Sequence, residues 1–170
     1  MRDPLLSAWR LEDGSAGLGD KGLLGRPLTA FFASRQCPGS AIRVSMDWAL
    51  EQARSKTPLT GGFQSPLELS VLEIALTAKS PVVIVLARGL NKARLPLPWR
   101  DALDEGHAAV VSMAADRQRL TEKNAIQRNH WVASHASRIV VGYADPAGIL
   151  ARQVVQWRDD GLAVQFLAGI

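Results

Sequence analysis

The run Pro-Val-Val-Ile-Val-Leu at residues 81–86 constrains the fold more than any other segment of the chain. β-Branched side chains dominate this run and no polar residue interrupts it, so both faces of the strand must be covered. Continuous apolar strands of this kind lie in the middle of parallel sheets. The segment therefore predicts a parallel sheet with helices packed on its faces.

Strand-like and helix-like segments alternate about five times from residue 28 onward, as parallel sheets with crossover helices require. Short apolar runs predict strands at 28–33, 57–60, 81–86, 108–112 and 138–141. Start signals and helical spacing predict helices at about 38–56, 65–79, 99–105 and 121–137. The alternation predicts an α/β fold with a mainly parallel sheet and helices on both faces. A hairpin is expected at the end of the chain, pairing 154–157 with 162–166 around Asp159-Asp160-Gly161.

The first 25 residues differ from the rest because they are rich in glycine and show little periodicity. We interpret residues 1–25 as an irregular arm that leads into a single domain at 26–170. Segment 17–22 fits the letters of the dinucleotide motif G-x-G-x-x-G. That motif needs a good strand before it and a helix after it, and neither is predicted here.

Composition limits the class of protein. A chain of 170 residues with 47% hydrophobic and 21% charged residues suits one globular domain rather than a disordered chain. No apolar run reaches the roughly 18–20 residues of a membrane helix, so no membrane association is expected. The single cysteine, Cys37, excludes an internal disulfide and a multi-cysteine zinc site, and it indicates a reducing cytoplasm. The histidines show no metal-ligand spacing, so no metal is expected. No cofactor is expected either.

Charge favours a phosphate-bearing partner without requiring one. Twenty basic and sixteen acidic residues give a net charge of +4. Ligands of parallel α/β sheets bind beyond the carboxyl ends of the strands, near a topological switch. The loops at these ends are expected at 34–40, 61–66, 87–98, 112–121 and 142–148. Any binding site should therefore draw on these loops.

The first two loops carry features that suit an anion. Ser34 and Arg35 offer a hydroxyl and a guanidinium beside the free N–H groups of a helix N-terminus. Gly61 and Gly62 allow a phosphate or a ligand backbone to come close. The purely structural alternatives are a capped helix with a surface arginine and a tight turn.

Further candidates lie later in the chain. Arg88 and Gly89 directly follow the strand at 81–86, where they face either a phosphate or solvent. Arg128 and Asn129 lie within a predicted helix, and Asn129 falls on its apolar stripe. A polar side chain in that place needs a partner, which is either backbone or ligand.

Glu68 has two interpretations. It closes the sequence Ser-Pro-Leu-Glu at residues 65–68, which has the form of a capping box at the start of a helix. This structural role accounts for the carboxylate. The alternative is a role as an acid or base in catalysis.

The order of these motifs resembles the Rossmann-like domain of the DNA processing protein A (DprA/Smf) family over about residues 28–148. In that family a first strand ends in Ser-Arg, as at residues 34–35, and a helix starts with Arg-Asn-Arg, which is similar to Arg-Asn-His at 128–130. A Gly-x-Gly-Leu turn is matched in part by Ala-Arg-Gly-Leu at 87–90. The arginine of the family's second loop is missing here.

The same superfamily includes the lonely-guy phosphoribohydrolases and the lysine-decarboxylase-like proteins. Residues 61–68 are similar to the motif Pro-Gly-Gly-x-Gly-Thr-x-x-Glu of the phosphoribohydrolases, with Gln64 in place of a glycine. This second resemblance implies an enzymatic alternative, a nucleotide N-glycosidase or phosphoribohydrolase with Glu68 as its carboxylate.

The DprA resemblance implies a Rossmann-like three-layer sandwich that binds a nucleotide or a short single-stranded nucleic acid. The residues expected to line the site are Ser34, Arg35, Gly61, Gly62, Arg88, Gly89, Arg128 and Asn129. A third possibility is a non-catalytic interaction module that forms a homodimer through Trp48 or Trp131.

Overall fold

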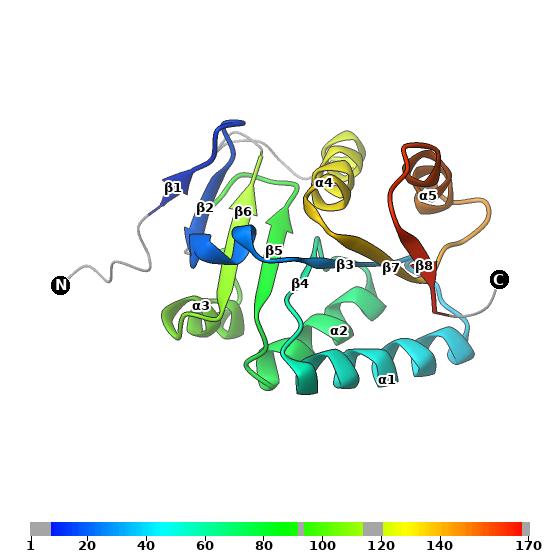
Figure 1. Ribbon diagram of the computed structural model, residues 1–170, viewed down its shortest axis with the longest axis horizontal. Coiled ribbons are helices and arrows are strands. Elements are labelled where there is room, and N and C mark those ends of the chain that lie inside the picture. The colour runs from blue at the N-terminus through cyan, green and yellow to red at the C-terminus, as the bar shows by residue number, and fades with distance from the viewer. Residues whose placement is uncertain (1–7, 92–93, 114–120, 168–170) are drawn as a thin grey trace.

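The computed structural model describes residues 8–91, 94–113 and 121–167. Within them, eight strands form one sheet in the order β1-β2-β6-β5-β4-β3-β7-β8 (Figure 1). The strands are β1 Trp9–Arg10, β2 Ala16–Gly19, β3 Thr29–Ala33, β4 Leu59–Gly61, β5 Val82–Leu86, β6 Ala108–Ser112, β7 Arg138–Tyr143 and β8 Val164–Phe166. Neighbouring strands from β6 to β8 are parallel, whereas β1 and β2 pair in antiparallel fashion. The predicted α/β fold with a mainly parallel sheet is confirmed.

Helices cover both faces of this sheet, with α1, α2 and α3 on one face and α4 and α5 on the other (Figure 1). Their bounds are α1 Gly39–Ser55, α2 Pro66–Thr77, α3 Leu97–Asp104, α4 Glu122–His135 and α5 Ile149–Asp159. Successive residues of β3 reach opposite layers, as the period of a strand requires. Phe31 stacks on Trp48 of α1, while Phe32 packs against Trp157 of α5. The three-layer arrangement implied by the resemblance is therefore present.

The strand order reverses beside β3. From β3 the chain adds β4, β5 and β6 on one side, then crosses through α4 to β7 and β8 on the other. The chain leaves β3 toward the layer of α1 and leaves β7 toward the layer of α5 (Figure 1). Loops that diverge in this way open a crevice at the carboxyl ends of the strands, where ligands of open α/β sheets bind.

Residues 8–25 are more regular than the sequence indicates. β1 and β2 extend the sheet beyond β6, and a 3-10 helix follows at Lys21–Gly25. β2 contains two glycines, so its sequence lacks the alternation of apolar and polar residues that predicts a strand. One of these glycines is needed for packing. A Cβ atom on Gly17 would lie 2.3 Å from the ring of Trp9. The expected irregular arm therefore differs from the structure here, and residues 1–7 lie outside the described residues.

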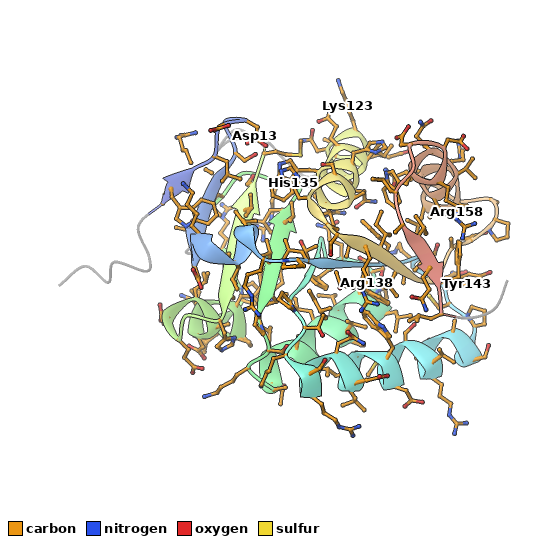
Figure 2. The ribbon with its side chains drawn as sticks, viewed as in Figure 1. Asp13, Lys123, His135, Arg138, Tyr143 and Arg158 are labelled. Carbon is orange, nitrogen blue, oxygen red and sulfur yellow. The ribbon has the colours of Figure 1, made fainter. Side chains whose placement is uncertain are left out.

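A hydrogen bond between side chains ties the N-terminal hairpin to α4, on the side of the molecule where Figure 2 labels Asp13 and His135. The Trp131 Nε1 donates a hydrogen bond to Asp13 Oδ2 at 2.9 Å. The ring of Trp131 also stacks on His135, with 3.7 Å between the ring centroids. This hydrogen bond joins residues that are far apart in the sequence, so no local sequence pattern predicts it.

The predicted C-terminal hairpin is wrong. Residues 154–157 belong to α5, and β8 pairs with β7 in parallel register. Val154 and Trp157 are three residues apart and both are buried, which is the spacing of a helix face rather than of a strand. The Asp-Asp-Gly sequence ends the helix instead of turning a hairpin, with Gly161 at a φ of +85°. The other predicted strands and helices are confirmed with small shifts at their ends. Across the described part of the chain, helices with the length and apolarity needed to span a membrane are absent.

Candidate functional site

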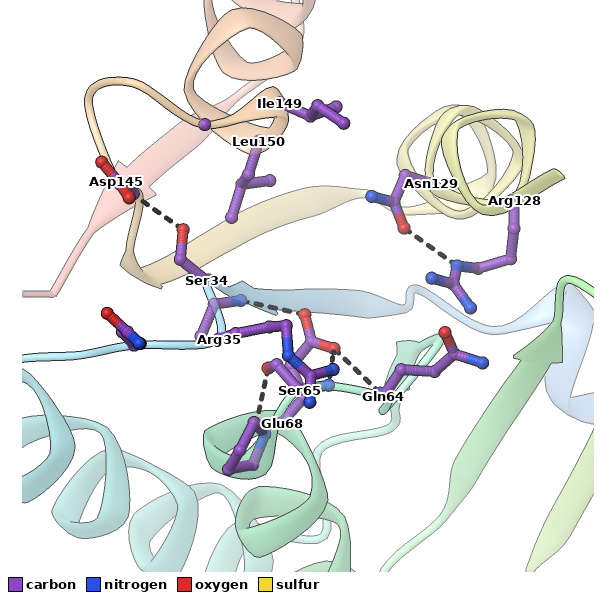
Figure 3. A pocket seen from close by; sticks show the side chains of 14 residues that line it. Ser34, Arg35, Gln64, Ser65, Glu68, Arg128, Asn129, Asp145, Ile149 and Leu150 are labelled. Carbon is purple, nitrogen blue, oxygen red and sulfur yellow. Dashed lines mark hydrogen bonds between the residues drawn. The ribbon is translucent and has the colours of Figure 1, made fainter. Parts of the chain in front are cut away.

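A pocket of about 710 Å³ opens at the switch point beside β3 (Figure 3). The segments that line it are the loop after β3, the start of α2 with the loop before it, the middle of α4, and the start of α5 with the loop after β7. Its lining residues are Ala33, Ser34, Arg35, Gln36, Gln64, Ser65, Pro66, Glu68, Arg128, Asn129, Asp145, Gly148, Ile149 and Leu150. Both helix layers therefore contribute to this one site.

Glu68 fastens two of these segments together. Its side chain is 7% exposed, and Oε2 accepts a hydrogen bond from the Ala33 N–H at 3.0 Å. Oε1 accepts from the N–H groups of Gln64 at 3.0 Å and Ser65 at 3.2 Å. The Ser65 hydroxyl accepts from the Glu68 N–H in return, which completes the predicted capping box. The carboxylate thus links the end of β3 to the start of α2.

The protonation of Glu68 depends on opposing effects. Burial raises the pKa of its carboxyl group above the ordinary value, although the three N–H donors and the charge of Arg128 act to lower it. The N–H groups of Ala33, Gln64 and Ser65 donate to both oxygens of Glu68. The ionised carboxylate suits these donors because both of its oxygens act only as acceptors. Both oxygens are thereby engaged with the backbone.

Arg128 lies in the interior of the site, with 5% of its surface exposed. Its Nε donates to Asn129 Oδ1 at 2.9 Å, whereas Nη1 is buried without a hydrogen-bond partner in the described part of the chain. A Cβ atom on Gly62 would lie 2.2 Å from the guanidinium carbon, so the glycine makes room for this group. Burial lowers the pKa of Arg128, and Glu68 opposes that shift. The guanidinium stays charged, because arginine does not lose its proton in proteins.

A chain of amides holds Arg128 in place. Asn129 Nδ2 donates to Gln153 Oε1 at 2.9 Å, and Gln153 Nε2 donates to the carbonyl oxygen of Ile126 at 3.2 Å. These bonds fix which end of the Asn129 amide faces the guanidinium. They also join α4 to α5 beside the pocket, and they supply the partner that Asn129 was expected to need.

Replacing Gln153 with leucine should lower the free energy of unfolding by about 1–3 kcal/mol, because the half-buried Asn129 amide loses its acceptor and the buried end of the amide chain is removed. Chemical denaturation measures this change. The variant Gln156→Leu is the control, since Gln156 lies on the exposed side of the same helix. Equal stability of both variants would contradict the proposed chain of amides.

The first N–H groups of α5 have no acceptor within the helix, and they lie at the pocket. Gly148 occupies the N-cap position without a side-chain hydrogen bond, and Ile149 and Leu150 line the pocket. The hydroxyl oxygen of Ser34 accepts from the Asp145 N–H at 2.8 Å, which leaves its own hydrogen available to donate. Arg35 is exposed at the same opening. These donors converge as an anion site requires.

The structure brings together four of the eight residues that the sequence suggests, and Glu68 with them. These four are Ser34, Arg35, Arg128 and Asn129. Gly62 lies beneath the guanidinium rather than on the pocket wall, and Gly61 ends the neighbouring β4.

Arg88 and Gly89 follow β5, two strands away from β3, and they do not line this pocket. The carbonyl oxygen of Arg88 accepts from the Ser112 hydroxyl at 2.6 Å, so this turn is joined to the end of β6. The following residues 92–93 lie outside the described residues.

Sequence reasoning missed the contributions of Asp145, Ile149, Leu150 and Gln153. The loop at 142–148 was expected at the carboxyl edge, but the helix after it was interpreted as part of a hairpin. The glycine before an amphipathic segment was the signal that could have located this uncapped N-terminus.

No protein-family model and no curated protein matches this chain. Solved structures do. The structure of DNA processing protein A from Streptococcus pneumoniae superposes with a TM-score of 0.73 at 15% identity, covering 89% of this chain and 54% of that one. This chain therefore has the fold of the part of DNA processing protein A to which it aligns. This chain thus spans about half the length of the S. pneumoniae DprA chain.

Two further comparisons place the fold more broadly. DprA from Helicobacter pylori, described for its single-stranded DNA binding mode, matches with a TM-score of 0.70 at 15% identity, over 96% of this chain and 91% of that one. The molybdenum cofactor binding protein from Rippkaea orientalis matches with a TM-score of 0.58 at 12% identity, over 83% and 76%. The fold implied by the sequence resemblance is therefore confirmed.

Proposed function

We propose that this chain binds a phosphate-bearing ligand, a single-stranded nucleic acid or a nucleotide, in the pocket beside β3. The observation that carries the proposal is the buried guanidinium of Arg128, whose Nη1 has no partner in the described part of the chain, at a pocket that also contains the uncapped start of α5. A buried donor without a partner costs free energy, and an anion would supply the acceptor.

Side chains and backbone groups around the pocket would each contribute to binding the phosphate. Arg35 and Arg128 would make charge-assisted hydrogen bonds to phosphate oxygens, and the Ser34 hydroxyl would add a neutral one. The N–H groups of Ile149 and Leu150, together with the dipole of α5, favour negative charge at the same place.

Two carboxylates also lie at the pocket, so the charges of its lining side chains balance. Glu68 is held by three N–H groups, and Asp145 Oδ1 accepts from the Ala147 N–H at 3.0 Å. The net charge of the lining side chains therefore does not attract an anion. The attraction comes from the N-terminus of α5 and from Arg128, whose charge acts strongly because the side chain is buried away from solvent.

Single-stranded nucleic acid is the ligand we favour. The H. pylori DprA structure that shares this fold is described for binding single-stranded DNA. The described lining residues include no aromatic side chain, so base stacking on a ring is not available there. Contacts to phosphate would then dominate the affinity, and binding should weaken steeply as salt rises.

The geometry of Glu68 favours binding over the enzymatic alternative. A catalytic carboxylate needs an oxygen free to exchange a proton with its substrate. Both oxygens of Glu68 accept backbone N–H groups, and the side chain is buried.

The test is fluorescence anisotropy with a labelled single-stranded oligonucleotide at low salt, with unlabelled nucleoside monophosphate as competitor. Arg35→Ala should weaken binding by about tenfold, because one charge-assisted hydrogen bond is lost. Arg26→Ala is the control, because Arg26 is an exposed arginine that precedes the amino-terminal end of β3, whereas the pocket lies at the carboxyl end. This variant should leave the affinity unchanged. Equal losses in both variants would indicate non-specific attraction, and no binding by the wild type at low salt would overturn the proposal.

A further inference from the structure

A groove of about 520 Å³ lies between α2 and α3, and it shares no lining residue with the pocket beside β3. Its walls are mainly apolar, formed by Leu69, Leu72, Leu76, Pro96, Pro98 and Trp99. Pockets that hold small molecules have volumes of roughly 300–1,000 Å³. The α2–α3 groove is therefore large enough for a ligand of its own.

The spacing of apolar residues along α2 explains one wall of this groove. Leu69, Leu72 and Leu76 recur at intervals of three and four, so they lie on one face of the helix. Leu72 is buried in the core, whereas Leu69 is 44% exposed. Trp99, near the start of α3, is partly buried against the same core. Part of the apolar wall therefore remains open to a ligand.

Three carboxylates border the same groove. Glu73 lies on the face of α2 that carries the leucines, and Asp101 and Glu105 are four residues apart on the α3 side. Lys79 pairs with Glu105 at 3.3 Å, whereas Glu73 and Asp101 form no ion pair within the described residues. The charged side chains that line the groove thus leave an excess of negative charge, although the whole chain has a net charge of +4.

Glu105 is contacted on one of its two oxygens. Lys79 Nζ and His107 Nε2, the latter at 3.2 Å, both approach Oε2. The contact with Lys79, followed by that with His107, lowers the pKa of Glu105, so this carboxylate is ionised at neutral pH. Carboxylates that line one groove repel one another, and a cation placed between them removes that repulsion.

We propose that the α2–α3 groove binds a small organic cation, a primary ammonium group attached to an apolar body. The ammonium group donates charge-assisted hydrogen bonds to the carboxylates of Glu73 and Asp101. The apolar body covers the exposed side chain of Leu69. The ring of Trp99 adds attraction for a cation that lies over its face.

Charge and wall composition together favour this class of ligand. The negative groove repels phosphate, so its ligand differs from the one proposed for the pocket beside β3. Across the part of the chain that the structure describes, no group of three His, Cys, Asp or Glu side chains is placed to hold a metal ion. A metal ion would also leave the apolar walls exposed to water, whereas the body of an alkyl or aryl amine covers them.

Titration of the isotope-labelled chain with phenethylammonium, followed by NMR, tests the proposal. Phenethyl alcohol is the neutral probe of nearly the same shape, and hydrocinnamate is the anionic probe. The ammonium probe should bind at least about fivefold more tightly than the alcohol, because it alone pairs with the carboxylates. Hydrocinnamate should not bind. The amide signals that shift should belong to α2 and α3.

Asp101→Asn should weaken binding of phenethylammonium by about threefold and leave binding of the alcohol unchanged, because one ion pair is lost. Asp104→Asn is the matched control, since Asp104 is an exposed carboxylate of α3 that does not line the groove. This control should bind the ammonium probe as the wild type does. The titrations contain no nucleic acid, so their outcome does not depend on the function proposed for the pocket beside β3.

Three results would each overturn the proposed site. The first is a wild-type chain that does not bind phenethylammonium. The second is equal affinity for the ammonium probe and the alcohol. The third is an equal loss of affinity in Asp101→Asn and Asp104→Asn, which would indicate a general effect of charge rather than a contact in the groove.

Discussion

Replacing Glu68 with glutamine should lower the free energy of unfolding by about 2–4 kcal/mol. The glutamine amide keeps one acceptor oxygen but turns an NH₂ group toward a backbone N–H, either that of Ala33 or those of Gln64 and Ser65. At least one buried donor then loses its partner. The buried Arg128 also loses the negative charge that compensates it.

Urea denaturation of both proteins measures this difference. Glu73→Gln is the control, because Glu73 is exposed on the same helix and its replacement should change stability by no more than about 0.5 kcal/mol. A Glu68→Gln variant as stable as the wild type would show that the carboxylate does not hold the two loops together. Such a variant, if it had lost an activity on nucleotides, would instead support the enzymatic alternative.

The residues that the sequence suggests for a site and that line the pocket in the structure carry a local signal. Ser34 and Arg35 follow an apolar strand directly, and the end of such a strand is where parallel sheets hold ligands. Asn129 interrupts the apolar stripe of its helix, and a polar group in that position needs a partner. In both cases chemistry and position are visible within a few neighbouring residues.

The contributions that escaped prediction depend on contacts between distant segments. Gln153 matters because α5 packs beside α4, and Asp145 because the loop after β7 meets the loop after β3. Arg88 failed to reach the pocket for a related reason. Its local sequence resembles a phosphate loop, but the strand order places β5 two strands from the switch point. Strand order is a tertiary property that local patterns do not determine.

Gly62 has a different position in the structure from the one that its sequence suggests. Its sequence suggests close approach of a ligand to bare backbone, whereas the structure fills that space with the guanidinium of Arg128. The glycine therefore acts on the pocket through the arginine. This reinterpretation leads to a sharper test than removing the arginine itself, because the positive charge is retained.

Replacing Gly62 with alanine should weaken binding of a single-stranded oligonucleotide by more than about tenfold, since the loss of a hydrogen bond to a charged group costs about 1.5–3 kcal/mol. The added Cβ would lie 2.2–2.5 Å from three atoms of the guanidinium, so the Arg128 side chain must move. The φ angle of Gly62 is not in the left-handed region, so alanine adds no backbone strain there.

Gly25→Ala is the matched control, because a Cβ at that glycine meets nothing within 4 Å. Anisotropy measures the affinity of both variants, and thermal melts establish that both are folded at the temperature used. A Gly62→Ala protein that binds as tightly as Gly25→Ala would exclude Arg128 as a ligand contact, even if Arg35 proves essential. Loss of binding confined to Gly62→Ala would instead show that the affinity depends on where the buried guanidinium is held, because the charge of the chain is the same in both variants.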